Sequence, residues 1–410
     1  MDRRGKGSFS KKADIVVIGA GIVGVTLAIE LKQRYSDCSV MLLEKEPFAG
    51  FHASGRNSGI LHAGFYYTAD SLKARFTRDG NILWRDYCRE KGLRINESGK
   101  LVVAISEKDL VGLDELCLRG ERNGVPLHYL TAKEAQEIEP RVITYGYALY
   151  SPTTASIDPR EVVATKIRDA VNFGIDIQYG CKFLLPGSSG REIITSHGKY
   201  EVGYLVNAAG LYADRIALQY GFSDSYRILP FKGLYIYATK RPFKLHTNIY
   251  PVPDMSKPFL GAHFTLTVDG HVTIGPTAIP AFWREHYNGV SRFKAGEFFE
   301  IVRREWDLFR RNTFGFRDLA FEEIKKYRKG YMVKEAAAML RGSETLGFRK
   351  RGHPGIRAQL LNVKTGQLEM DFKYEGDDRS FHVLNAVSPA FTCAIPFSKY
   401  LADRIQQLIK

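Results

Sequence analysis

Apolar runs and glycine turns alternate along the first part of the chain. Residues 15–18 form an apolar run that leads into a glycine-rich turn, and apolar residues then recur at helical spacing from position 22 to about position 32. A second apolar run, residues 40–43, ends at Glu44. This order predicts a buried strand, a tight turn, a helix and a second buried strand, as in a parallel sheet covered by helices.

Two later segments have a similar character. Residues 204–207 form an apolar run that ends in the small residues 208–210, and residues 192–202 predict a preceding hairpin that turns at His197-Gly198. A third segment, residues 381–396, leads into a terminal helix that extends to residue 410. Because three separated segments would have to converge on one ligand, we expect the ligand-binding domain to be discontinuous.

The segments between them predict a second region. Residues 101–105 resemble a strand, and residues 108–123 resemble an amphipathic helix. Residues 226–279 alternate and are rich in aromatic side chains, which predicts antiparallel strands with one solvated face. Helices are expected at 296–311 and 320–340, on one side of a mixed sheet. The expected strands are residues 233–238, 259–268 and 271–274.

The turn after the first strand has the sequence Gly19-Ala20-Gly21-Ile22-Val23-Gly24, and Glu44 follows about 20 residues later. Gly19 permits the tight turn, Gly21 lets a pyrophosphate approach the backbone, and Gly24 lets the helix pack on the strand. The helix N-terminus offers unpaired N–H groups and a positive dipole end to phosphates. Since Glu44 can accept hydrogen bonds from an adenosine ribose, the pattern predicts a dinucleotide site.

Composition limits the remaining possibilities. The chain has 410 residues, 44% of them hydrophobic, enough for one large fold or two domains. No run approaches the length of a transmembrane helix, and residues 1–12 are expected to be a flexible basic tail without a secretory signal. The five cysteines include no CxxC pair, which favours a reducing, cytoplasmic compartment and no structural metal.

The net charge of +14 has three interpretations. Basic residues concentrate at 325–329 and at Arg341, Arg349, Lys350 and Arg351. They can form a solvated helical face, bind an anionic membrane surface on the inner side of the cell membrane, or bind nucleic acid. No nucleic-acid-binding motif accompanies the charge, so no nucleic-acid partner is expected.

The loop after the second strand, residues 52–59, is small, polar and rich in glycine where a nicotinamide dehydrogenase would continue with another strand and helix. Such a loop can wrap a flavin and its diphosphate. With this loop, the chain resembles the FAD-dependent D-amino-acid oxidase superfamily, and within it the L-2-hydroxyglutarate oxidase/dehydrogenase branch. The resemblance covers nearly the whole chain, although residues 1–12 lie outside it and residues 325–351 match loosely. It is carried by residues 54–67, 71–74, 230–233, 249–254, 258–261, 275–277, 355–359, 385–386 and 388–390.

The resemblance implies an α/β fold, with a Rossmann-like FAD-binding domain of the glutathione-reductase-2 type and an α+β substrate domain built on an antiparallel sheet. The expected FAD-binding domain comprises residues 13–100, 150–225 and 352–410, and the substrate domain comprises residues 101–149 and 226–351. The resemblance also implies FAD-dependent oxidation of L-2-hydroxyglutarate, a small-molecule 2-hydroxy diacid, to 2-oxoglutarate.

The candidate cofactor ligands lie in the same separated segments. The N-terminus of the terminal helix, after the turn at residues 388–390, would stabilise negative charge on the reduced flavin. The candidates are Gly19, Ala20, Gly21, Ile22, Val23, Gly24, Glu44, Lys45, Ser54, Gly55, Arg56, Asn57, Ser58, Gly59, Lys182, Phe183, Ala208, Ala209, Gly210, Pro389, Ala390, Phe391 and Thr392.

Oxidation of a 2-hydroxy acid requires a cation for the carboxylate and a base for the hydroxyl proton. Arg357, in a glycine–hydrophobe–arginine setting similar to that of related oxidases, is the carboxylate candidate, because a guanidinium binds two oxygens in one plane. His62 is the candidate base, with His263 as its competitor and a structural role as the alternative.

A second carboxylate needs a further donor, and Lys232, Arg56 and Tyr250 are all candidates. Tyr66 and Tyr67 either close the site or pack in the core, and Cys393 is expected to be a packing residue. Electrons would pass to a quinone, to oxygen or to a soluble flavoprotein. Three other functions stay open: an amine or amino-acid oxidase, a malate:quinone-type oxidoreductase, and a nucleic-acid-binding flavoprotein.

Overall fold

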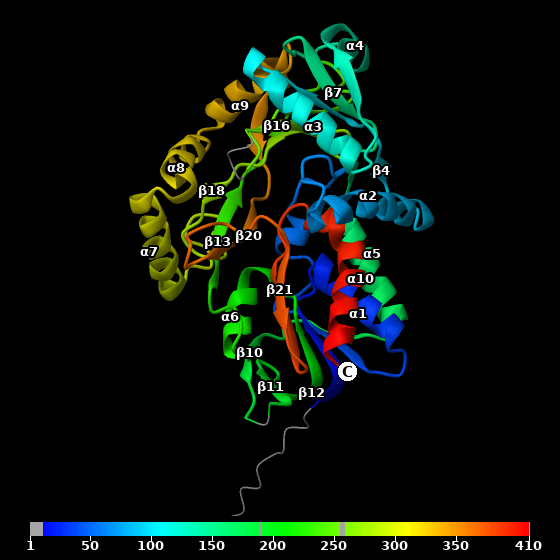
Figure 1. The fold of residues 1–410 in the computed structure, drawn as a ribbon, viewed down its shortest axis with the longest axis vertical. Helices are drawn as coiled ribbons and strands as arrows, with labels where there is room; N and C mark the ends of the chain where they lie inside the picture. Colours follow the sequence, from blue (N-terminus) through cyan, green and yellow to red (C-terminus); the bar gives the residue numbers. More distant parts are fainter. Residues whose placement is uncertain (1–10, 189, 255–258, 410) are drawn as a thin grey trace, which may run out of the picture.

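The computed structural model describes residues 11–188, 190–254 and 259–409 (Figure 1). Of the expected flexible basic tail, residues 1–10 lie outside the described residues, as does Pro258 of the resemblance. For Lys11 and Lys12 the expectation is wrong, because both belong to a strand and pair with Tyr200 and Glu201. No helix in these ranges is long and apolar enough to cross a membrane.

An eight-stranded sheet forms around the predicted first strand. Parallel pairing joins β9, β2, β1, β12 and β22 in that order. The predicted hairpin is confirmed, although Thr195 pairs with Gly198, so the turn is at Ser196-His197, one residue earlier than predicted. The strands are β1 (Lys11–Ile18), β2 (Val40–Leu43), β9 (Asp176–Gln178), β10 (Phe183–Pro186), β11 (Glu192–Thr195), β12 (Gly198–Asn207), β21 (Lys373–Gly376) and β22 (Ser380–Asn385).

Alternate residues of β1 enter two cores on opposite faces of this sheet. Ile15 and Val17 pack into a large apolar cluster shared with four helices, and Val16 and Ile18 pack into a smaller cluster on the other face. The four helices are α1 (Ile22–Arg34), α2 (Leu72–Glu90), α5 (Pro159–Asn172) and α10 (Ala390–Leu408). Figure 1 shows α1, α5 and α10 side by side.

A second eight-stranded sheet lies at the other end of the molecule, in the order β19-β14-β17-β16-β15-β5-β7-β6. It is mixed, because β15 and β5 run parallel while the other pairs are antiparallel. Its strands are β5 (Lys100–Val103), β6 (His128–Thr131), β7 (Tyr147–Ser151), β14 (Ile236–Ala238), β15 (Asn248–Pro251), β16 (His263–Leu266), β17 (Val272–Gly275) and β19 (Phe348–Arg351).

Two expectations for this sheet are wrong. The strands β16 and β17 are buried along their whole length and have no solvated face. Helices cover both sides of β5, because Val102 packs with α3 (Leu110–Arg122) whereas Leu101 packs with α9 (Lys329–Ala337). Residues from distant segments thus bury surfaces that the local alternation predicted to be solvated.

A three-stranded sheet, β18-β13-β20, links the two larger sheets. It pairs β13 (Tyr226–Gly233) with β20 (Gly355–Asn362), and β18 (Ile279–Pro280) completes it. The expected strand over 233–238 is wrong, since β13 ends at Gly233 and β14, in another sheet, begins at Ile236. The division into two domains stays a prediction. A further small sheet consists of β3 (Ile60–Leu61), β4 (Ile95–Asn96) and β8 (Ala155–Ile157).

Three helices pack beside these sheets, where the sequence predicted two. Helix α7 (Ala295–Arg311) matches its prediction, but the helix expected over 320–340 is divided into α8 (Phe316–Lys325) and α9. The division follows from packing, because Ala320 of α8 enters one apolar cluster and Met332 of α9 enters another. One straight helix could not bury both faces. Two short helices, α4 (Ala132–Ile138) and α6 (Ala213–Gln219), complete the fold.

Candidate functional site

The three separated sequence segments line one cavity of about 810 Å³, a volume typical of cofactor and ligand sites. Its wall includes the glycine turn after β1, the loop after β2, the turn after β12 and the N-terminus of α10. The strand β20 contributes residues 355–358 to the same wall. The fold therefore brings together most of the residues that the sequence singled out.

The glycine turn has the geometry that a dinucleotide requires. A Cβ atom on Gly19 would lie 2.6 Å from the Ala208 carbonyl oxygen, and one on Gly24 would lie 1.9 Å from the Gly19 carbonyl oxygen. Gly21 is the N-cap of α1 and provides no side-chain cap. The backbone is therefore accessible to a ligand, and the Ser54 hydroxyl accepts one hydrogen bond from this turn, from the Ile22 N–H at 2.9 Å.

Glu44 is buried at the end of β2, where it also lines the cavity. Its carboxylate accepts hydrogen bonds of 2.9 Å from the N–H groups of Ala20 and Glu46. Burial raises the pKa of Glu44, and these two bonds favour the ionised form. Each carboxylate oxygen retains a second acceptor position, so the geometry is compatible with a ribose hydroxyl.

The small-residue loop after β2 is held by its own hydrogen bonds. Asn57 donates to the carbonyls of Ala53 and Ser54 and accepts from the N–H of Gly59. Ser54, Arg56, Asn57 and Ser58 line the cavity, whereas Ala20, Gly55 and Gly59 do not. A Cβ on Gly55 or Gly59 would meet a backbone carbonyl oxygen at 2.4 or 2.2 Å, so these glycines permit close packing of the loop.

The N-terminus of α10 points into the same cavity. Pro389, Ala390, Phe391 and Thr392 all line it, and the helix has no side-chain N-cap. The Trp84 indole donates to the Phe391 carbonyl oxygen at 2.9 Å and fixes this first turn. The helix therefore directs its positive end at whatever the cavity holds. The remaining predicted residues on the wall are Lys45, Lys182, Phe183, Ala208, Ala209 and Gly210.

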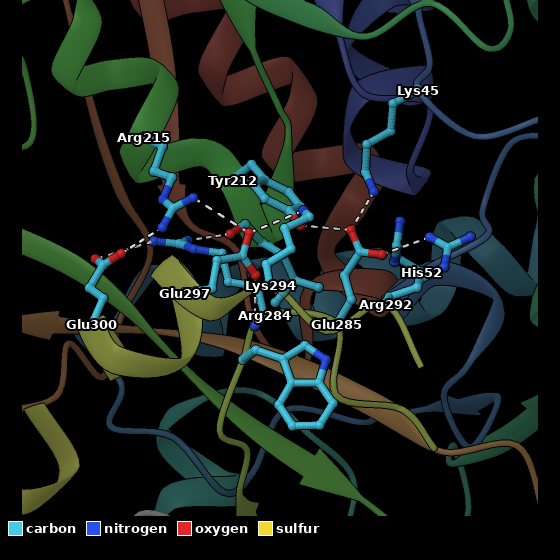
Figure 2. A network of polar contacts seen from close by, with 12 residues as sticks. Lys45, His52, Tyr212, Arg215, Arg284, Glu285, Arg292, Lys294, Glu297 and Glu300 are labelled. Carbon is cyan, nitrogen blue, oxygen red and sulfur yellow. Dashed lines mark hydrogen bonds and ion pairs between the residues drawn. The ribbon is translucent and has the colours of Figure 1, made fainter. Parts of the chain in front are cut away.

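An ion-pair network that sequence reasoning missed borders the cavity (Figure 2). Arg292 donates to both Glu46 and Glu285 at 2.6 Å, and Lys45 pairs with the same two carboxylates. Burial alone would raise the pKa of Glu285, but Lys45 and Arg292 outweigh it and lower the pKa to about 2. Oxygens of both acids and a ring nitrogen of His52 lie within 4.8 Å of one another. The network joins the end of β2 to the segment before α7.

The cavity wall also carries the residues predicted for chemistry. His62, Arg357, His263 and Tyr250 all line it. The Arg357 guanidinium lies 5.2 Å from the centre of the Phe259 ring, and the His263 ring stacks on Tyr250 at 3.7 Å. These side chains come from separate parts of the chain, and the fold gathers them on the wall of one cavity.

Both histidines are in environments that favour the neutral ring. Burial, and after it the nearby positive charge of Lys100, lowers the pKa of His62 well below its ordinary value. Burial lowers the pKa of His263 to about 3. The His263 Nδ1 atom lies 2.8 Å from the Gly261 carbonyl oxygen and must donate to it, which leaves Nε2 as an acceptor.

The structure does not bring every predicted residue to the wall. Lys232 is buried with its ammonium 5.9 Å from the centre of the Tyr327 ring, and the Tyr66 hydroxyl is buried without a hydrogen-bond partner in the described part of the chain. Neither side chain lines the cavity. Their roles toward a substrate stay predictions.

Lys100, which the sequence analysis did not single out, is fully buried behind this wall. Its ammonium has no hydrogen-bond partner among the described residues and lies between the rings of Phe65, Tyr66 and Tyr250. Burial lowers its pKa to about 7. The sequence signal was a lysine at the head of an otherwise apolar strand.

The glycine turn, the acid after β2 and the cavity define a dinucleotide-binding protein. A family described as FAD dependent oxidoreductase (DAO) matches residues 14–404. The chain is 34% identical over 409 residues to L-2-hydroxyglutarate dehydrogenase of Escherichia coli K12, covering 97% of this chain and 94% of that protein. It is also 34% identical to the mitochondrial L-2-hydroxyglutarate dehydrogenase of Homo sapiens, covering 96% and 89%. The chain belongs to the FAD dependent oxidoreductase family.

Solved structures agree on the fold. L-α-glycerophosphate oxidase from Mycoplasma pneumoniae with FAD bound superposes with a TM-score of 0.75 at 20% identity, covering 97% of this chain and 95% of that one. Glycine oxidase from Geobacillus kaustophilus gives 0.70 at 19% identity, with coverage of 97% and 95%. The expected Rossmann-like fold and the expected cofactor are confirmed. The bare backbone at Gly19, Gly21 and Gly24 and the buried Glu44 carboxylate fit FAD.

Proposed function

We propose that this protein oxidises L-2-hydroxyglutarate to 2-oxoglutarate. The observation that carries the proposal is the near full-length similarity to L-2-hydroxyglutarate dehydrogenases from bacteria and mammals. The cavity supports it, since its wall has the features of a dinucleotide site and also carries a guanidinium and two neutral imidazoles. These are the groups that oxidation of a 2-hydroxy acid requires.

The loop after β2, the glycine turn and the first turn of α10 would hold the cofactor. Bound FAD supplies the acceptor for the hydride that leaves Cα of the substrate. Glu44 would bind the ribose, and the N-terminus of α1 would face the pyrophosphate. The N-terminus of α10 would stabilise negative charge that develops on the cofactor.

Arg357 would bind the carboxylate beside the reacting carbon. The guanidinium lines the cavity on β20 and can bind both oxygens in one plane, which fixes the orientation of Cα. The guanidinium lies over the ring of Phe259, which favours the positive charge. Orientation of this kind is a large part of what an active site contributes to rate.

His62 would accept the proton of the substrate hydroxyl. A base must be unprotonated before the reaction, and the lowered pKa of His62 meets that condition at neutral pH. His263 is the competing base, because its neutral Nε2 is an acceptor on the same cavity wall. For the second carboxylate the candidates remain Arg56 and Tyr250, on the wall, and Lys232 behind it.

For the second half of the reaction, we propose that electrons pass to a quinone, with oxygen as the alternative. A quinone dissolved in a bilayer suits a protein that binds the inner face of the cell membrane peripherally from the cytoplasm. The net charge of +14 favours an anionic surface. We also propose the division into an FAD-binding and a substrate-binding domain given above.

The test is anaerobic mixing of the purified protein with L-2-hydroxyglutarate while the flavin band near ~450 nm is followed. Rapid bleaching, much slower with D-2-hydroxyglutarate and L-malate, supports the proposal. Faster bleaching by malate would favour a malate:quinone-type enzyme, and bleaching by an amino acid with release of ammonia would favour an amino-acid oxidase. A yellow protein that none of these reduces would contradict the proposed substrate.

A further inference from the structure

The outer face of α7 and α8 carries large apolar side chains where a water-soluble helix usually carries polar ones. Phe299 is 70% exposed and Trp306 is 64% exposed, whereas Ile301 and Leu308, on the inner face of α7, are buried. Phe321 and Ile324 are exposed in the same way on α8. Single exposed apolar residues are common, but a group of aromatic residues on neighbouring helices indicates a contact surface.

Ring contacts join the aromatic side chains of α7 to those of α8. The Trp306 ring stacks on Phe309 at 6.0 Å, and Phe309 meets Phe321 of α8 edge to face at 5.6 Å. The two helices lie next to each other along one side of the molecule (Figure 1, yellow). We call this surface, consisting of Phe299, Trp306, Phe309, Phe321 and Ile324, the aromatic face.

Positive charge surrounds the aromatic face. Among the carboxylates of α7 and α8, both of which the structure describes in full, Asp318 alone is exposed, while Glu297, Glu305 and Glu323 are buried. Glu300, Asp307 and Glu322 are half-buried, and Asp307 is paired with Arg311. The exposed basic residues are Arg303, Arg310, Arg311, Arg317, Lys325 and Arg328.

We propose that the aromatic face docks on an anionic lipid bilayer. Aromatic side chains with a basic border, on helices too short to span the membrane, are typical of helices that lie in the bilayer interface. Tryptophan and phenylalanine enter the headgroup region, and the arginines contact lipid phosphates. A second copy of this chain fits less well, since two such faces would bring their positive borders together.

The helices that carry the aromatic face pack against strands that also reach the candidate site. Ile301 and Leu308 of α7 and Ala320 of α8 belong to the same apolar cluster as Phe231 of β13. Phe231 pairs with Arg357 of β20. Phe293 and Lys294, just before α7, line the cavity itself. Docking would therefore place the cavity close to the bilayer, where the proposed quinone acceptor is dissolved. The purpose of docking rests on the proposed function, but docking itself is tested independently of it.

A tryptophan of the chain can serve as a fluorescent probe of the aromatic face. Of its three tryptophans, Trp84 and Trp283 are buried and Trp306 is exposed. Mixing the FAD-loaded protein with phosphatidylcholine vesicles that contain phosphatidylglycerol should shift the Trp306 emission to the blue, and brominated lipid should quench it. High salt should reverse both effects, because screening weakens the attraction. Pure phosphatidylcholine vesicles should give a much smaller change.

Two pairs of variants test the assignment by vesicle co-sedimentation. Two double variants should each weaken vesicle binding roughly tenfold or more. One carries Trp306→Gln and Phe321→Gln, and the other carries Arg303→Glu and Lys325→Glu. The matched controls are Ile82→Gln with Val111→Gln, exposed apolar positions on α2 and α3, and Arg122→Glu with Lys133→Glu on α3 and α4. These controls should bind as the parent does.

Equal loss in test and control variants would overturn the proposal, as would equal binding to neutral and anionic vesicles. A lipid-free dimer in sedimentation velocity that Trp306→Gln abolishes would assign the face to a second copy instead. Flavin bleaching by L-2-hydroxyglutarate without lipid is measured on the same samples. If L-2-hydroxyglutarate bleaches the flavin but the protein does not bind vesicles, only the docking proposal is contradicted. If the protein binds vesicles but its flavin is not bleached, only the proposed substrate is contradicted.

Discussion

The ammonium of Lys100 lies 4.5 Å from the centre of the Tyr250 ring. Tyr250 separates this buried cation from the cavity, because the tyrosine lines the cavity wall and the lysine does not. Among the described residues Lys100 has no carboxylate partner, and the faces of Phe65, Tyr66 and Tyr250 stabilise its charge. Burial of the charged lysine therefore lowers the stability of the folded protein by an amount that depends on pH.

Replacing Lys100 with methionine should stabilise the protein most at low pH. Burial lowers the pKa of Lys100 to about 7, against about 10.4 in the unfolded chain. Between these two pH values the lysine is protonated in the unfolded chain but neutral in the folded protein. The stability of the parent protein therefore rises with pH, and the cost of burying Lys100 decreases. We expect the Lys100→Met variant to gain up to about 4 kcal/mol below pH ~7 and progressively less toward pH ~10.

Thermal unfolding across this pH range measures the effect. Lys133→Met, at an exposed position on α4, is the matched control and should change the melting temperature little at any pH. A Lys100→Met variant that melts below the parent at every pH would show that the cation–π contacts outweigh the cost of burial.

The glycine turn gives a second prediction, because its packing leaves no room for a side chain. A Cβ on Gly24 would lie 1.9 Å from the Gly19 carbonyl oxygen, whereas one on Gly296 of α7 would have no atom within 4 Å. We expect Gly24→Ala to cost about 3 kcal/mol and to release FAD. Gly296→Ala should be neutral or slightly stabilising. The ratio of flavin to protein absorbance after gel filtration checks this, and retention of FAD by Gly24→Ala would contradict it.

The turn was predictable because all its determinants are close together in the sequence. The apolar run of β1, the three glycines, the helical spacing of α1 and the acid after β2 all lie within residues 15–44. Strand–turn–helix geometry is largely local, and glycine at a positive φ, as at Gly19, has few alternatives. The hairpin at β11 and β12 was predictable for the same reason.

Other features depend on contacts that no local pattern encodes. Lys100 is an ordinary residue at the head of a strand until the fold packs Phe65, Tyr66 and Tyr250 around it. Arg292 reaches Glu46 across 246 positions of sequence. Similarly, the spacing over 320–340 is helical throughout, and only the two separate cores show why α8 ends before α9 begins.

Arg357 gives a third prediction, in which geometry matters as much as charge. Arg357→Gln should lower kcat/KM for L-2-hydroxyglutarate about 100-fold, since a charge-assisted hydrogen bond contributes about 1.5–3 kcal/mol. Arg357→Lys should recover part of the loss, because an ammonium keeps the charge but not the planar fork. Arg349→Gln, at an exposed position on β19, is the control for charge alone. Steady-state kinetics on variants that retain the flavin spectrum checks this, and equal losses at the two positions would contradict it.

The last prediction concerns which histidine accepts the hydroxyl proton. If His62 is the base, His62→Gln should slow anaerobic flavin bleaching by about 10²- to 10⁴-fold, and His263→Gln should slow it far less. The Lys100→Met variant tests whether a buried histidine is the base at all, because loss of a nearby positive charge raises the pKa of both His62 and His263. Its activity should therefore decline at higher pH than that of the parent as the solution is acidified, while His62→Gln should lack this acid limb. A larger loss in His263→Gln, together with an acid limb that persists in His62→Gln, would transfer the role to His263, whose Nε2 is also an acceptor on the wall.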